Sequence, residues 1–100
     1  MVSKVSEITI EDVARYIRVD DYDEGEIETY LNIAKTYISS YTGIPITSED
    51  GESLDDFPEF VIVVYILCQD MYDNRTLYVD KSNINKTVQT ILDMHTRNNL

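Results

Sequence analysis

The sequence predicts a small all-α domain built from four helices. Apolar residues recur at helical spacing in four segments, and most of those segments are flanked by residues that start or stop helices. The 100 residues are 43% hydrophobic, and no segment carries a strong strand pattern. A chain of this length buries roughly 65% of its unfolded surface, which suffices for one modest core. We therefore expect a single all-α domain covering residues 1–100.

The first helix should begin near Thr9 and end around Val19. Thr9 can cap the helix, and Asp12 stands three residues later, where a capping box usually has Glu. The apolar stripe of this helix follows the i, i+3, i+4, i+7 spacing and consists of Ile10, Val13, Ala14 and Ile17.

The second helix should begin at Asp23 or Glu24 and run to about Thr42. Gly43 can adopt the left-handed conformation that closes a helix, and Pro45 prevents continuation. Residues at helical spacing hold the pattern for four turns, namely Ile27, Tyr30, Leu31, Ala34, Tyr37, Ile38 and Tyr41.

The third helix should start at Pro58, a favoured first-turn residue, with Asp55 or Asp56 as its cap. It should continue to Tyr72 or Asn74. Apolar residues occupy nearly all of its sides, which is typical of a central, buried helix. The stretch FVIVVYI is rich in β-branched residues and could form a strand, but its length and the proline start favour a helix.

Two loops and a fourth helix complete the expected order. Residues 46–57 are polar and acidic and predict a surface loop, and residues 75–83 predict a second loop. The fourth helix should span Asn85 to Arg97. One side of it is lined by Ile84, Val88, Ile91, Leu92 and His95.

The net charge is 8 − 19 = −11, and the acids are unevenly placed. Twelve of the nineteen lie in two clusters, Asp20, Asp21, Asp23, Glu24, Glu26 and Glu28, and Glu49, Asp50, Glu52, Asp55, Asp56 and Glu59. Such a charge repels phosphate backbones and anionic membranes, so it argues against sequence-specific DNA binding and membrane binding. The simplest interpretation of each cluster is a solvated surface that maintains solubility.

The longest apolar stretch, Phe60 to Cys68, is too short to cross a bilayer. Residues 1–7 lack the pattern of a signal peptide, and a single cysteine excludes an intramolecular disulfide. We therefore expect a protein of a reducing compartment.

No residue pattern predicts catalysis, a metal or a cofactor. With Asp20 as position 1 of a calcium loop, Gly25 takes position 6, but Leu31 replaces the essential Glu at position 12. His95 is the only histidine and lacks a nucleophile or a second ligand, so a packed or capping role is expected. Cys68 should be an inert apolar residue.

The chain has eight tyrosines, no tryptophan and two phenylalanines. Tyr30, Tyr37 and Tyr41 fall on the apolar side of the second helix, and Tyr16 falls near the edge of the first stripe. Core packing is the default expectation for them. Tyrosine is also favoured in half-buried surfaces that make protein contacts.

Five pieces of sequence occur in a distinctive order. They are TxEDVxxYIRVD at residues 9–20, the acidic break 20–26, IxxYLxxAxxYIxxYTG at 27–43, a proline-started apolar helix ending in MYDNR at 71–75, and NKTVQTILDMH at 85–95. Together they resemble the head–tail connector proteins of long-tailed bacteriophages, also described as head-completion, adaptor or DNA-packaging proteins. The resemblance covers nearly the whole chain, and its specificity lies in the order of the pieces.

The resemblance implies an all-α bundle that self-associates into a ring under the portal protein at the capsid vertex. The ring would extend the DNA channel and offer a platform to a tail or neck completion protein. The family has no enzymatic activity, cofactor or membrane partner. The expected location is the neck of the virion, and the host cytoplasm during assembly. DNA would pass through without specific binding, which suits an acidic chain.

The resemblance also suggests which residues contact neighbours. Tyr72, Asn74 and Arg75 match the family's Tyr-x-Asn-Arg signature, and they either end the third helix and anchor the following loop or form an interface. The segment 81–97 is locally basic, and a portal-facing or neighbour-facing role is a further hypothesis for it. The candidate interface residues are Tyr72, Asn74, Arg75, Lys81, Lys86 and Arg97. Nothing is implied for residues 47–57, where such proteins vary.

Two other classes of protein deserve comparison. An inhibitor that mimics DNA with its carboxylates is the alternative function, supported by the charge of −11. A mimic needs acids spread along one face at phosphate-like spacing, whereas most acids here crowd a helix start and a loop. A small hydrolase is disfavoured because no set of nucleophile, base and orienting group can be assembled.

Overall fold

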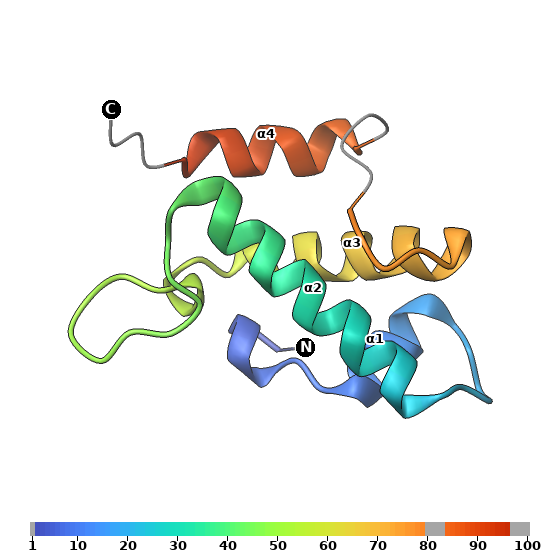
Figure 1. Cartoon of the computed structure of the whole chain (residues 1–100). Helices are drawn as coiled ribbons and strands as arrows, with labels where there is room; N and C mark the ends of the chain where they lie inside the picture. The colour runs from blue at the N-terminus through green and yellow to red at the C-terminus, as the bar shows by residue number, and fades with distance from the viewer. Residues whose placement is uncertain (1, 80–83, 97–100) are drawn as a thin grey trace.

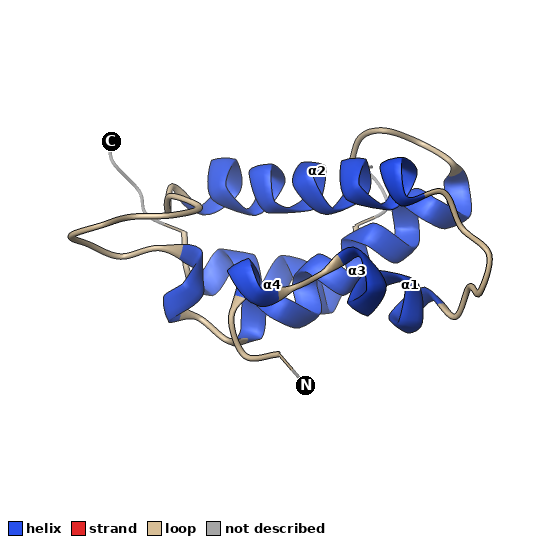
Figure 2. Cartoon of the chain, turned by 90° about the horizontal axis from the view of Figure 1, so that it is seen from below, coloured by secondary structure: helices blue, strands red, loops and turns tan. Residues whose placement is uncertain are grey.

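The computed structural model describes residues 2–79 and 84–96. Helices joined by loops are the only regular secondary structure in this part of the chain (Figures 1 and 2). The elements in order are η1 (Val5–Glu7), α1 (Ile10–Ile17), α2 (Glu24–Thr42), η2 (Leu54–Asp56), α3 (Glu59–Asn74) and α4 (Lys86–Met94). The predicted all-α class with four α-helices is confirmed.

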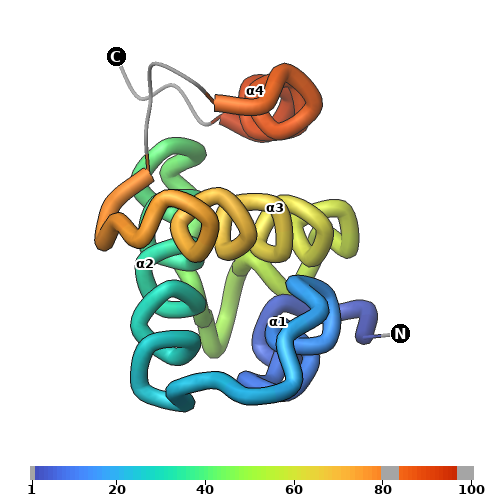
Figure 3. The backbone as a smooth tube through the Cα atoms, turned by 90° about the vertical axis from the view of Figure 1, so that its right-hand side faces the viewer, coloured from blue at the N-terminus to red at the C-terminus, as the bar shows by residue number. Residues whose placement is uncertain are grey.

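Helix α3 lies at the centre of the bundle. It contacts α1, α2, α4 and η1, and Figure 3 shows it between α4 on one side and α1 on the other. Its buried residues are Phe60, Val61, Val63, Val64, Tyr65, Leu67, Cys68 and Met71. The prediction of a central helix is therefore confirmed, because other elements pack against most of its sides, and only a strip that includes Ile62, Ile66 and Asp73 stays partly or fully exposed.

The predicted cap of α1 is present. The Thr9 Oγ1 accepts from the Asp12 N–H at 3.1 Å, and the Asp12 carboxylate accepts from the Thr9 N–H at 3.0 Å. The helix ends at Ile17, two residues before Val19, because Arg18 adopts the left-handed conformation with φ 69°. This conformation breaks the helical hydrogen-bond pattern.

Both predicted ends of α2 are confirmed. The Asp23 carboxylate accepts from the Gly25 N–H at 2.8 Å and so satisfies a free donor at the helix start. Gly43 closes the helix with φ 79°, a conformation that residues with a side chain adopt only at a cost.

The predicted cap of α3 is wrong. Pro58 occupies the capping position and makes no side-chain hydrogen bond to the helix. Asp56 instead accepts from the Ser53 N–H at 3.0 Å within η2, and Asp55 accepts from the N–H and hydroxyl of Ser6 at 2.9 and 2.7 Å. The two acids belong to a separate turn before α3, so their side chains serve that turn and the N-terminal segment.

The expected surface loop 46–57 is only partly exposed. Leu54 is 0% exposed and joins the core from η2, while the preceding stretch extends away from the bundle (Figure 1). The N-terminal turn η1 also contributes a buried residue, Val5, and contacts η2, and the next residue, Ile8, is buried as well. The sequence pattern did not predict either short turn, because each contributes only one or two apolar residues to the core.

Helix α4 is shorter than predicted. Asn85 caps its start, with its side-chain oxygen accepting from the Thr87 N–H at 2.7 Å, and His95 follows its last residue. Val88 and Leu92 are buried, and the Tyr41 hydroxyl of α2 donates to Asp93 of α4. These contacts place α4 across one side of α2 and α3.

Candidate docking surface at the end of helix α3

The end of α3 turns sharply at Arg75. This residue adopts the left-handed conformation with φ 51°, and the Thr76 N–H donates to the Met71 carbonyl at 3.1 Å. The turn closes the helix without a glycine, although a left-handed residue that carries a side chain is disfavoured by local sterics. Contacts of the Arg75 side chain can offset this cost.

Those contacts form a cluster of four side chains that joins the start of α2 to the end of α3. The Arg75 Nη1 lies 2.6 Å from the Glu26 carboxylate, and the same carboxylate accepts from the Tyr30 hydroxyl at 2.7 Å. The Arg75 guanidinium lies 4.4 Å from the centre of the Tyr72 ring. The Tyr72 ring meets the Tyr30 ring edge-on, at 6.5 Å between centroids. We name Glu26, Tyr30, Tyr72 and Arg75 the Glu26–Arg75 cluster.

The protonation states of Tyr30 and Arg75 keep both side chains as hydrogen-bond donors to Glu26 at neutral pH. Burial, followed by the hydrogen bond to Glu26, raises the pKa of Tyr30 to about 12, so its hydroxyl remains a donor at neutral pH. The hydrogen bond to Glu26 likewise raises the pKa of the Arg75 guanidinium. Glu26 thus receives two donors at once, one from a buried phenol and one from a guanidinium at the surface.

The structure brings three of the candidate interface residues together. Tyr72 is half-buried and Arg75 exposed within the cluster, and Asn74 is exposed beside them, donating to the Asp70 carbonyl at 2.9 Å. The exposed Lys86 lies apart, in the first turn of α4. The two other candidates, Lys81 and Arg97, lie outside the described residues.

Leu77 and Tyr78 follow the signature after one residue, Thr76, and the sequence pattern did not single them out. They are 64% and 62% exposed, which is unusual for large apolar side chains on one short segment. A depression of about 290 Å³ next to them is lined by Leu67, Asp70, Met71, Asn74, Thr76, Tyr78, Val79 and Ile84. Two adjacent large apolar residues in a predicted loop were the signal that could have identified them.

Glu26 was also missed as a functional candidate. Its partner Arg75 lies 49 residues away in the chain, and the spacing of neighbouring residues in the sequence cannot predict such a distant pair. The surface that we consider for docking therefore consists of the exposed part of the Glu26–Arg75 cluster, Asn74, Leu77 and Tyr78.

The two residues that the sequence offered for chemistry, His95 and Cys68, both pack within the bundle. His95 packs against the rings of Phe57 and Phe60, at 4.6 and 5.1 Å between centroids, and its Nε2 lies 2.9 Å from the Glu59 carboxylate. Cys68 is fully buried, and burial raises the pKa of its thiol to about 12. The predictions that His95 is packed and that Cys68 is buried are confirmed.

Within residues 2–79 and 84–96, no three side chains of His, Cys, Asp or Glu are grouped to hold a metal ion. In the same part of the chain, no helix combines the length and the apolar character needed to span a membrane.

Comparison of the chain with protein-family models, curated proteins and solved structures finds no match. The sequence pattern and the geometry of the surface are therefore the observations that bear on function.

Proposed function

We propose that this chain is a structural protein of the bacteriophage neck. It docks as a ring under the portal, extends the DNA channel and offers a platform to the next neck or tail protein, without catalysis. The observation that carries the proposal is the order of the five sequence pieces along 100 residues. The all-α bundle agrees with the fold that the resemblance implies.

The end of α3 is the surface that suits docking best. The Glu26–Arg75 cluster holds the turn after α3 against α2, so the adjoining Leu77 and Tyr78 are presented by a fixed support. Interfaces favour an aromatic and an arginine side chain next to exposed apolar area, because these groups combine large contact area with directed hydrogen bonds. Subunits in a ring use two different patches, and this surface is our candidate for one of them.

The charge of −11 supports a passive conduit. DNA that slides through a channel must not adhere to its wall, and carboxylates repel phosphates at ordinary salt. The same charge favours the alternative, an inhibitor that mimics DNA. Several of the acids, however, bind groups of this chain itself, including Asp23, Glu26 and Asp56, which fits structural roles better than a row of phosphate substitutes.

The decisive experiment is electron microscopy of an induced lysate in which this gene alone is disrupted. We expect separate tails beside heads that are empty or leaking DNA, which places the protein at the joint between them. Normal infectious particles would overturn the proposal. Inhibition of a restriction enzyme or another DNA-binding protein by the purified chain would then favour the DNA mimic.

A further inference from the structure

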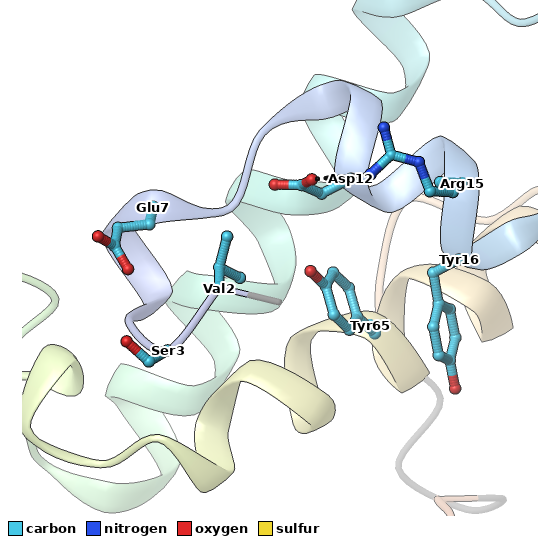
Figure 4. A pocket seen from close by; sticks show the side chains of 7 residues that line it. All are labelled: Val2, Ser3, Glu7, Asp12, Arg15, Tyr16 and Tyr65. Carbon is cyan, nitrogen blue, oxygen red and sulfur yellow. Dashed lines mark ion pairs between the residues drawn. The ribbon is translucent and has the colours of Figure 1, made fainter.

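A broad groove lies between the N-terminal segment, α1 and α3, and shares no residue with the docking surface described above. Its volume is about 670 Å³. Figure 4 shows the seven side chains that line it, Val2, Ser3, Glu7, Asp12, Arg15, Tyr16 and Tyr65. The groove is far larger than one side chain requires, so an extended segment of several residues fits its dimensions.

Tyr65 is the unusual residue of this groove. It is only 7% exposed, and its ring stacks on that of Tyr16, with 5.0 Å between centroids and 15° between planes. Its hydroxyl points into the groove between Val2 and Asp12 (Figure 4). Among residues 2–79 and 84–96 this hydroxyl has no hydrogen-bond partner, although the rest of the side chain is buried.

The hydroxyl of Tyr65 is therefore available to a ligand from the groove. No fully enclosed polar side-chain atom of the described residues lacks a partner, so this hydroxyl reaches the solvent of the groove. Burial, followed by the nearby Asp12 carboxylate, raises the pKa of Tyr65. The phenol consequently stays neutral and can both accept and donate a hydrogen bond.

The charges around the groove favour a cation. Arg15 lies 2.8 Å from Glu11 and 3.5 Å from Asp12, so its own charge is already compensated. Glu7 is exposed and makes no ion pair within the described part of the chain. The three charged residues that line the groove sum to 1 − 2 = −1, counting Arg15 against Glu7 and Asp12. Glu11 pairs with Arg15 from outside the groove and leaves the Glu7 carboxylate as the uncompensated charge.

We propose that this groove binds a basic segment of a partner protein. A lysine or arginine of that segment donates to the Tyr65 hydroxyl and the Glu7 carboxylate, and its aliphatic stem lies on the exposed part of the Tyr16 ring. Tyr16 is 39% exposed, which leaves apolar area for the stem. A cation beside an aromatic ring gains a further electrostatic attraction.

The partner is a different protein rather than a second copy of this chain. A second copy would have to bring a basic segment to this groove, and this chain has only 8 Lys and Arg residues against 19 Asp and Glu residues. The ring contacts of the proposed function are assigned to the surface after α3 and not to this groove. A basic segment of another protein is attracted before contact, which raises the rate of its association. The proposal does not depend on the neck function, because the groove and the docking surface have no residue in common.

The test is a titration of the full chain, followed by the nuclear magnetic resonance signals of Tyr16 and Tyr65. The probe is a blocked pentapeptide with a central arginine between alanine and glycine residues. Its matched control replaces the arginine by citrulline, which has nearly the same shape but no charge. We expect the arginine peptide to shift both tyrosines and the citrulline peptide to bind at least about fivefold more weakly.

Two variants locate the contact. Tyr65→Phe keeps the ring stack and removes only the unpaired hydroxyl, so the fold should persist while the affinity falls about fivefold. Glu7→Gln should reduce the affinity about threefold. Glu28→Gln is the matched control, because it changes the net charge equally, from −11 to −11 + 1 = −10, at an exposed site outside the groove.

Three outcomes would overturn the proposal. Equal binding of the arginine and citrulline peptides would exclude recognition of the charge. Unchanged affinity in Tyr65→Phe would exclude the hydroxyl, and equal losses in Glu7→Gln and Glu28→Gln would reduce the effect to general attraction by an acidic protein. Spermidine, a small polyamine, is a second probe. If it binds more tightly than the arginine peptide, the groove is a site for small cations and the proposal of a protein segment is also overturned.

Discussion

At the residue scale, one carboxylate organises the corner between α2 and α3. Glu26 accepts from the buried Tyr30 hydroxyl at 2.7 Å and pairs with Arg75 at 2.6 Å. Arg75 in turn covers the Tyr72 ring at 4.4 Å. A single side chain therefore links a buried phenol, a left-handed turn and an exposed cation, which makes its removal costly.

Replacement of Glu26 tests this link. Glu26→Ala leaves the Tyr30 hydroxyl without its acceptor, so we expect the free energy of unfolding to fall by about 1–3 kcal/mol. Urea denaturation followed by circular dichroism measures the change. Glu28→Ala removes an exposed acid from the same helix and should stay within about 0.5 kcal/mol of the parent. Equal effects of the two replacements would contradict the role of Glu26.

The left-handed Arg18 offers a prediction of opposite sign. Its φ is 69°, and its side chain makes no ion pair within the described residues. Arg18→Gly relieves the steric cost of this conformation and should stabilise the fold by about 0.5–1 kcal/mol. Arg15→Gly, inside α1, should destabilise it by about 1 kcal/mol. Thermal unfolding of both variants distinguishes them, and a destabilised Arg18→Gly would contradict the prediction.

The tyrosines predict how stability depends on pH. The pKa of Tyr30 is raised from 10.0 to about 12 by burial and then by its bond to Glu26, and that of Tyr41 to about 12 by its bond to Asp93 and then by burial. Because the folded protein keeps both phenols neutral, their contribution is complete below pH 10 and is lost as the pH rises towards 12. Urea midpoints measured across this interval should fall, and they should fall less in Tyr30→Phe. A flat profile would contradict the assignment.

At the scale of elements, α4 depends on few anchors. Val88 and Leu92 are its buried residues, and the bonds from Tyr41 to Asp93 and from His95 to Glu59 fix its last turn. The long helices α2 and α3, by contrast, share an extensive apolar contact. The attachment of α4 should therefore respond strongly to the loss of one apolar side chain.

Leu92→Ala measures that attachment. Leu92 is fully buried, so its truncation should cost about 2–5 kcal/mol and reduce the hydrogen-exchange protection of α4. Met94→Ala, in the same helix and 70% exposed, should change the stability by less than about 0.5 kcal/mol. Comparable losses in the two variants would show that burial of Leu92 is not what holds the helix.

At the scale of the whole molecule, an exposed apolar patch belongs to a strongly acidic chain. The charge of −11 comes mainly from acids at the start of α2 and around η2, and the exposed apolar side chains Leu77 and Tyr78 follow α3. Arg75 compensates Glu26 beside this patch, while the remaining acids keep the rest of the surface hydrated.

The neck proposal makes a prediction at this scale. A phage that carries Tyr78→Asp should form few joined particles, because a carboxylate in a contact patch carries a desolvation cost. Met94→Asp introduces the same charge at another exposed site and should assemble normally. Counts of joined particles and circular dichroism of both purified chains distinguish an assembly defect from misfolding. Normal assembly with Tyr78→Asp would remove this surface from the proposal.

The sequence by itself determined the helices whose ends depend on neighbouring residues. Thr9 with Asp12, Asp23 and Gly43 act through hydrogen bonds and backbone conformations that span at most a few positions, so local patterns sufficed for the start of α1 and for both ends of α2. The sequence also predicted the central position of α3, because apolar residues occupy nearly all sides of this helix.

Only the tertiary structure decided the contacts between distant segments. Arg75 meets Glu26, and Ser6 meets Asp55, each across 49 positions, and Leu54 enters the core from a segment that is otherwise polar. The groove beside Tyr65 likewise joins the N-terminal segment to α1 and α3. Such contacts depend on how helices pack against one another, and packing is set by the sum of many weak apolar contacts that no local spacing encodes.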